Sequence, residues 1–172
     1  MSLETARLTL RKLAETDAAH LHTLLSDPEI MQFWDVAALT DFATTTEILA
    51  AQLFDAASGS ALYWAIERTT DHTFLGTCDI SEIDHHHRRA DIGFMLARPC
   101  WGMGYAIEAM QAVIAHAAMH LKLQRLSART HAGNTRSIAL LAKLGFHQEG
   151  MLRGYIERDN QRRDCPIFGL LL

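Results

Sequence analysis

Cysteine is scarce in this sequence. Three of its 172 residues are cysteines, Cys78, Cys100 and Cys165, and no two of them form a Cys-x-x-Cys pair. An odd number of widely spaced cysteines supplies neither a disulfide framework nor a zinc-binding set. We therefore expect reduced thiols and no metal site.

Long apolar runs and an excess of positive charge are also missing. No stretch approaches the roughly 18 consecutive apolar residues of a transmembrane helix, and the opening "MSLETARLTLRKL" lacks the apolar segment of a signal peptide. The formal net charge of −4 argues against a surface built to bind nucleic acid. These absences predict a cytoplasmic protein with neither nucleic acid nor membrane as a partner.

The sequence does contain enough apolar material for one domain. Hydrophobic residues make up 49% of the chain and charged residues 21%, a balance typical of a globular protein of this length. No linker-like tract and no internal repeat interrupts it. We expect residues 1–172 to form a single domain.

Apolar periodicity predicts an α/β sheet of mixed direction, with the element order β-α-α-β-β-β-α-β-α-β-β. Helical spacing indicates a short helix capped by Thr16 and ended by Pro28, then helices at 41–57, 103–121 and 134–145. Strand patterns occupy 7–13, 61–68, 73–83, 90–97, 125–130, 146–157 and 165–172, the last two joined by a turn. The strand–helix–strand unit over 90–130 must be a parallel crossover.

The segment "RPCWGMGYAIEAM" (98–110) places Gly102 and Gly104 where a strand of this crossover meets its helix. Unpaired N–H groups at a helix N-terminus hold an anion, and glycine lets the backbone approach it. Two glycines by themselves are a weak motif, and they more often form only a tight turn. A Rossmann fingerprint would need a glycine at Ile107, and a P-loop would need Gly-Lys-Ser/Thr, so neither nucleotide motif is present.

Several segments in order resemble the GNAT superfamily of acetyl-CoA-dependent N-acetyltransferases. "WGMGYA" (101–106) is similar to its pyrophosphate-binding loop, Gln/Arg-x-x-Gly-x-Gly/Ala, with Trp101 in place of Gln/Arg. "ADIGFML", "WGMGYAIEA", "NTRSIALLAKLGF" and "EGMLR" are similar to the branch that includes the RimJ and RimL enzymes, which acetylate N-termini of ribosomal proteins. The resemblance covers nearly the whole chain. It implies a GNAT-like, mostly antiparallel central sheet with flanking helices, and acetyl-CoA as co-substrate.

The resemblance also implies where coenzyme A binds. It places the pyrophosphate on the amides of Gly102, Met103, Gly104, Tyr105 and Ala106, the pantetheine along Phe94, Met95 and Leu96, and Asn134 near the pantetheine arm. From the residues alone, Asn134 is equally an ordinary helix N-cap, and Phe94 and Leu96 are equally core residues.

Two catalytic positions of the family are not filled here. The tyrosine general acid of many members falls on Leu141, and the glutamate of some members falls on Arg129. Ser137 holds the position to which the RimL-like branch assigns the acid role. Without the resemblance, Ser137 is a serine that bonds to the local backbone.

Carboxylates on the central strands are the candidates for a general base. Asp79 shares a strand face with Ser81, Glu82 lies on the other face, and Asp91 sits among apolar residues of the next strand. A carboxylate on an apolar surface has a raised pKa and can act as a base, although many such groups are structural. We rank Asp91 and Asp79 ahead of Glu82.

Histidines offer a weaker signal. The three in "DHHHRR" (84–89) are consecutive and cannot all reach one ion, so a solvated hairpin loop is expected there. His131 ends a predicted strand and either faces substrate or lies in solvent. Phe33 and Trp34 are either cleft-lining aromatics or core residues.

We expect an acetyltransferase that passes an acetyl group directly from acetyl-CoA to a primary amine, preferably the α-amine of a protein N-terminus. A small-molecule amine, such as an antibiotic or polyamine, is the alternative acceptor. A non-catalytic acyl-CoA-binding sensor is the alternative class, because the family's tyrosine and glutamate are missing. Relatives also suggest a homodimer.

Overall fold

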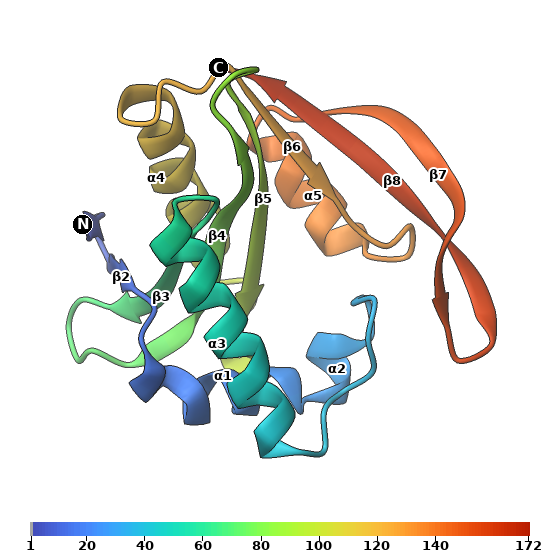
Figure 1. The fold of residues 1–172 in the computed structure, drawn as a ribbon, viewed down its shortest axis with the longest axis horizontal. Helices are drawn as coiled ribbons and strands as arrows, with labels where there is room; N and C mark the ends of the chain where they lie inside the picture. The colour runs from blue at the N-terminus through green and yellow to red at the C-terminus, as the bar shows by residue number, and fades with distance from the viewer. Residues whose placement is uncertain (1) are drawn as a thin grey trace.

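The computed structural model describes residues 2–172, which build an eight-stranded sheet with helices on both faces (Figure 1). The strands are β1 (Leu3–Glu4), β2 (Leu8–Lys12), β3 (Leu62–Arg68), β4 (Phe74–Asp84), β5 (Arg89–Leu96), β6 (Arg125–Arg129), β7 (His147–Arg158) and β8 (Gln161–Leu171). The helices are α1 (Ala18–Leu25), α2 (Pro28–Met31), α3 (Phe42–Ser58), α4 (Tyr105–Met119) and α5 (Thr135–Lys143). Short 3-10 turns cover Glu15–Asp17 and Arg98–Cys100.

The sheet is mixed but mostly antiparallel, as the sequence predicts. Its strand order is β1-β2-β3-β4-β5-β6-β8-β7, and among the described residues β5 and β6 are the one parallel pair. Helix α4 makes the crossover between them, in agreement with the predicted strand–helix–strand unit.

The parallel pair is short, and this opens the sheet. Residues 89–91 of β5 pair with residues 125–127 of β6, and beyond Asp91 no pairing joins the two strands. Figure 1 shows β5 and β6 diverging from this point like a fork. The rest of β5 therefore keeps a free edge toward β6.

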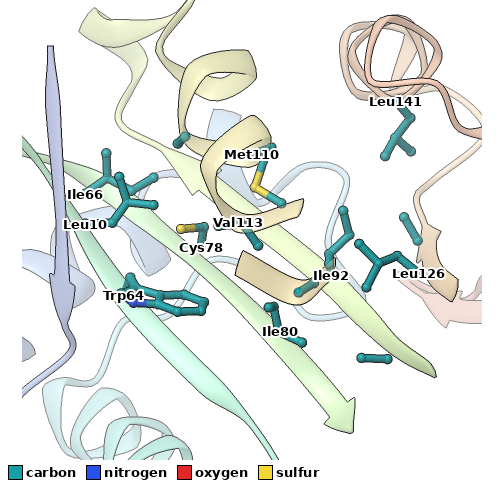
Figure 2. Close-up of a cluster of buried hydrophobic side chains, with 14 of the residues drawn as sticks. Leu10, Trp64, Ile66, Cys78, Ile80, Ile92, Met110, Val113, Leu126 and Leu141 are labelled. Carbon is teal, nitrogen blue, oxygen red and sulfur yellow. The ribbon is translucent and has the colours of Figure 1, made fainter. Parts of the chain in front are cut away.

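Two hydrophobic cores lie on opposite faces because successive strand residues point to opposite sides. On one face, Met110 and Val113 of α4 pack with Cys78 and Ile80 of β4 (Figure 2). On the other, α1, α2 and α3 cover Ala65 and Met95, together with buried leucines of α1 and α3. Ile92 and Leu96 of β5 and Leu126 and Ala128 of β6 belong to the first core, so buried packing holds both strands of the fork.

The first helices differ from the prediction. Thr16 does not cap a helix; it lies in a 3-10 turn, where the buried carboxylate of Asp17 accepts hydrogen bonds from Arg11 and from the Ala14 amide. Helix α1 ends at Leu25, and Pro28 begins α2 instead of ending α1. The carboxylate of Asp27 caps α2 by accepting from Glu29 N at 2.9 Å, and proline is well suited to the first helical turn.

The C-terminal hairpin agrees with the prediction and forms one edge of the sheet. Asp159 and Asn160 both have left-handed φ values, 55° and 58°, which suits a two-residue turn between twisted strands. β7 is the edge strand, and its register with β8 shifts between Gln148 and Gly150 and again between Leu152 and Ile156.

Candidate active site

A cleft of about 620 Å³ lies at the fork. The end of β5, the loop after it, the first turn of α4, α5 and the segment after α2 bound this cleft. It is lined by most of the residues predicted to bind coenzyme: Phe94, Met95, Leu96, Gly102, Gly104, Tyr105, Ala106 and Asn134. Met103 does not line it, because its side chain is exposed and its carbonyl accepts a hydrogen bond from Arg7.

The glycine loop is both a tight turn and a row of free donors. Gly102 and Gly104 have φ values of 76° and 79°, a left-handed conformation that favours glycine. Gly104 is also the N-cap of α4. Within residues 2–172, the N–H groups of 102–106 have no hydrogen-bond partner. Such amides at a helix N-terminus suit an anionic group.

Trp101 fastens this loop to β5. Its indole Nε1 donates to the carbonyl of Leu96 at 2.8 Å, and the guanidinium of Arg136 lies 4.8 Å from the centre of its ring. Trp101 therefore anchors the loop where the family pattern has Gln or Arg. Arg136 and Lys143 also line the cleft, and the sequence analysis did not single them out.

Asn134 and Ser137 both begin α5 and line the cleft. Asn134 Oδ1 accepts from the Ser137 amide at 3.1 Å, so Asn134 is an N-cap whatever else it does. The Ser137 hydroxyl forms no hydrogen bond to any residue that the structure describes, which leaves it free toward the cleft. Leu141 is only 1% exposed and belongs to the core, so the tyrosine position of the family is apolar here.

The Asp79 carboxylate reaches over Gly93 toward the fork. Asp79 pairs with Gly93 across β4 and β5, and Asp79 Oδ1 lies 2.5 Å from where a Cβ on Gly93 would be. Ser81 Oγ donates to Asp79 Oδ2 at 3.0 Å. Burial raises the pKa of Asp79 to about 6, with a further contribution from the charge of Asp91, while the Ser81 bond opposes the shift.

Asp91 lies on the same face, opposite Ser81, at the apex of the fork. Glu82 is exposed and has a φ of 50° where the β4–β5 register shifts, and it lines a second hollow together with Asp91. The structure thus brings Asp79 and Asp91 together, but neither carboxylate is among the residues that line the cleft at the fork. Gly93 was missed by the sequence analysis, although a glycine inside a strand pattern signals a close approach.

An aromatic segment forms the opposite wall. Phe33 and Trp34, which follow α2, line the cleft. Arg158 of β7 holds this segment, since its Nη1 donates to the carbonyls of Met31 and Trp34, the latter at 3.0 Å. No local sequence signal links β7 to α2, so this contact was not predictable.

His131 packs its ring against Phe33, with centroids 5.6 Å apart. Its Nδ1 accepts from the Gly133 amide at 2.9 Å, which assigns the ring proton of the neutral form to Nε2. Burial lowers the pKa of His131, and the charges of Arg163 and Arg158 lower it further. Because Nε2 is buried without a partner, His131 does not face solvent as a base.

Arginines dominate the charge on this side of the fork. Arg129 Nη2 lies 3.9 Å from Asp35, and Arg129 Nη1 donates to the Tyr155 hydroxyl at 3.1 Å. Asp159 lies within ion-pair distance of both Arg158 and Arg163. The local carboxylates Asp35 and Asp159 are therefore already paired.

The remaining sequence candidates lie elsewhere. His85, His86 and His87 are exposed in the β4–β5 turn, where a solvated loop was expected. Within residues 2–172, no three His, Cys, Asp or Glu side chains are grouped as a metal site. In the same part of the chain, no helix combines the length and the apolarity that crossing a membrane requires.

Comparison with known proteins matches this arrangement. The family model "Acetyltransferase (GNAT) domain" matches residues 7–147. The chain is 36% identical to an uncharacterized N-acetyltransferase, p20, of Bacillus licheniformis, over 99% of this chain and 96% of that protein. It is 30% identical to the [ribosomal protein uS5]-alanine N-acetyltransferase of Escherichia coli, over 65% of this chain and 58% of that protein.

A solved structure has the same fold. The spermidine N-acetyltransferase from Vibrio cholerae, crystallised with CoA and spermine, superposes with a TM-score of 0.87 at 21% identity, covering 97% of this chain and 96% of that chain. The relatives thus include enzymes named for both protein and polyamine acceptors.

Proposed function

Because the chain belongs to the acetyltransferase (GNAT) domain family, and is therefore an N-acetyltransferase that uses acetyl-CoA, we propose that its acceptor is the α-amine of a protein N-terminus. The coenzyme pyrophosphate sits on the amides of residues 102–106, and the pantetheine follows the free edge of β5. Residues that line the cleft and the unpaired amides support this arrangement.

The charge distribution around the fork carries the choice of acceptor. A polyamine brings several ammonium groups, and each needs a carboxylate when water is excluded. On the β6–β8 side Asp35 and Asp159 are taken up by arginines, which leaves Asp79 and Asp91 at the apex. Two adjacent carboxylates, one with a raised pKa, suit a single amine better than an extended polycation.

The basicity of the acceptor agrees with the chemistry available. A protein α-amine has a pKa near 7.7–8.0, so roughly a fifth to a third is neutral at pH 7.4, against about one part in a thousand for lysine. The neutral amine attacks the thioester carbonyl, and a backbone amide of β5 stabilises the oxyanion. Asp79 accepts the proton released by the amine, and Ser137 donates a proton to the departing thiolate.

Thiol release from acetyl-CoA tests the acceptor directly. We expect a peptide with a free N-terminus to be acetylated faster than the same peptide with a blocked N-terminus and one lysine, and faster than spermidine. Mass spectrometry of the product would place the acetyl group on the α-nitrogen. A higher kcat/KM for spermidine or for the blocked lysine peptide would overturn the proposal. If none of the amines tested caused thiol release, none of these acceptors would be supported.

A further inference from the structure

The contacts of Arg7 point to a role in coenzyme binding. We propose that Arg7 is a positioning residue that holds the 102–105 loop with its amides turned toward the cleft. The inference rests on the proposed placement of the coenzyme pyrophosphate, but it does not depend on which amine is the acceptor.

Arg7 contacts the loop from the side away from the cleft. Its Nη1 donates to the carbonyl of Met103 at 3.0 Å, and its guanidinium lies 4.6 Å from the centre of the Tyr105 ring. Its Nη2 lies 3.4 Å from where a Cβ on Gly104 would be. Met103 and Tyr105 therefore contact one side chain that is about 100 residues away in sequence, and that side chain also faces Gly104 between them.

Glu108 holds Arg7 in this position. The Glu108 carboxylate accepts from Arg7 Nε at 2.6 Å, from the Arg7 amide at 2.8 Å and from Thr5 Oγ1 at 2.7 Å. Glu108 lies in the first turn of α4, one turn beyond Gly104. The chain before β2 is thus fastened to the same helix whose N-terminus faces the cleft.

The bond to Met103 fixes the direction of a donor. The Met103 carbonyl and the Gly104 N–H belong to one planar trans peptide unit, in which they point in opposite directions. Because the carbonyl points to Arg7, the N–H of Gly104 points to the other side, where Gly104 lines the cleft. Trp101 fastens the start of the loop to β5, and Arg7 adds a second anchor at Met103, between the two conformationally permissive glycines.

An ordinary surface ion pair does not account for these contacts. The Arg7 side chain is 47% exposed, and exposed pairs contribute little to folding. Arg162 provides a matched comparison, because it also pairs with a carboxylate, Glu157 at 2.9 Å, and donates to a backbone carbonyl, Gly154 at 3.0 Å. Arg162 lies in the β7–β8 hairpin and has no part in the coenzyme loop.

The test compares coenzymes with and without the pyrophosphate. CoA and pantetheine binding to wild type, Arg7→Met, Arg7→Lys and the control Arg162→Met would be measured by calorimetry, with melting curves as a check on folding. We expect Arg7→Met to weaken CoA binding about tenfold or more and to leave pantetheine binding unchanged. The control Arg162→Met should bind both compounds like wild type. Arg7→Lys keeps the positive charge but lacks the planar set of guanidinium donors, so its CoA affinity should lie between those of wild type and Arg7→Met.

Two outcomes overturn the proposal. Equal losses for CoA and pantetheine in Arg7→Met would mean that Arg7 serves the fold, and unchanged CoA affinity would mean that the loop needs no anchor. If Arg7→Met does not fold, Glu108→Gln, which keeps the side chain's size, should show the same selective loss. Wild-type protein that binds pantetheine as tightly as CoA would instead refute the pyrophosphate placement, whatever amine is acetylated.

Discussion

At the scale of single residues, Ser137 is the predicted source of the proton for the leaving thiolate. Its hydroxyl is free while its amide is bonded to Asn134, so Ser137→Ala should leave the helix cap intact. General acid catalysis commonly contributes about 10²–10⁴-fold, and we expect kcat to fall by about tenfold or more, with the KM for acetyl-CoA unchanged. Steady-state kinetics with a saturating amine measure both values. An unchanged kcat would remove Ser137 from the mechanism.

The buried Asp79 carboxylate should lower the stability of the protein at neutral pH while it supports activity as the base. Below pH 4 its carboxyl is protonated in both folded and unfolded chains; as the pH rises through about 6 the buried group must ionise, and stability is lost. A rise of about two pKa units corresponds to about 3 kcal/mol as an upper limit. Asp79→Asn should therefore raise the melting temperature at pH 7.4 but not at pH 4, while kcat/KM falls.

The control for Asp79 is Asp84→Asn, on the same strand. Hydrogen bonds from His87 and Arg89 lower the pKa of Asp84, so its removal should have the opposite sign and reduce stability at neutral pH. Asp79→Asn with lower stability at pH 7.4 and full activity would contradict both assigned roles.

The sequence predicts several side chains of the site, but not which residues of other elements those side chains contact. The Asn134 cap follows from its place before a helical pattern, and alternation puts Asp79 and Ser81 on one face. The approach of Asp79 to Gly93 depends instead on the register of β4 against β5, which a strand pattern does not specify.

At the scale of elements, the glycine loop should fail when its backbone is forced out of the left-handed region. A Cβ at Gly104 would point toward Arg7, so Gly104→Val acts through backbone strain of about 1–2 kcal/mol, not by filling the coenzyme position. We expect the rise in melting temperature that acetyl-CoA induces to shrink strongly in Gly104→Val. Gly104→Asn should keep more of it, because asparagine tolerates this conformation. If acetyl-CoA raised the melting temperature of both variants as much as that of wild type, the glycines would form only a turn.

Element positions were predictable where periodicity was long. The α3, α4 and α5 helices and the central strands lie within a few residues of their predicted ranges. The two-residue β1 and the four-residue α2 are too short for a periodic pattern; β1 forms by pairing with β2, and α2 forms at its Asp27 cap. Pro28 shows the ambiguity: it excludes helix before it and favours helix after it.

At the scale of the whole molecule, the two groups that must be deprotonated before the reaction, Asp79 and the acceptor α-amine, should both appear in the pH dependence of kcat/KM. Since kcat/KM follows the free enzyme and free amine, its logarithm should rise with slope two below about pH 6, slope one to about pH 8, and then level off. Asp79→Asn should remove the lower limb and keep slope one. A wild-type slope of one down to pH 5 would exclude Asp79 as the base.

The mixed sheet was predictable as a whole, but the fork was not. The parallel crossover follows from the order strand, helix, strand. β5 and β6 pair over only three residues, and no local pattern in either strand encodes where the pairing ends. The contact between Arg7 and the 102–105 loop likewise joins segments about 100 residues apart in the sequence, which no local pattern predicts.

The edge strand β7 has a consequence for self-association. Twelve residues with unpaired backbone groups on one side offer a template on which another chain could add a strand. The two register shifts interrupt the regular spacing of those groups, and the strand carries charged residues such as Arg153 and Glu157, which disfavour edge-to-edge pairing. The irregularity of β7 thus guards the protein against edge-to-edge aggregation while it refolds at high concentration.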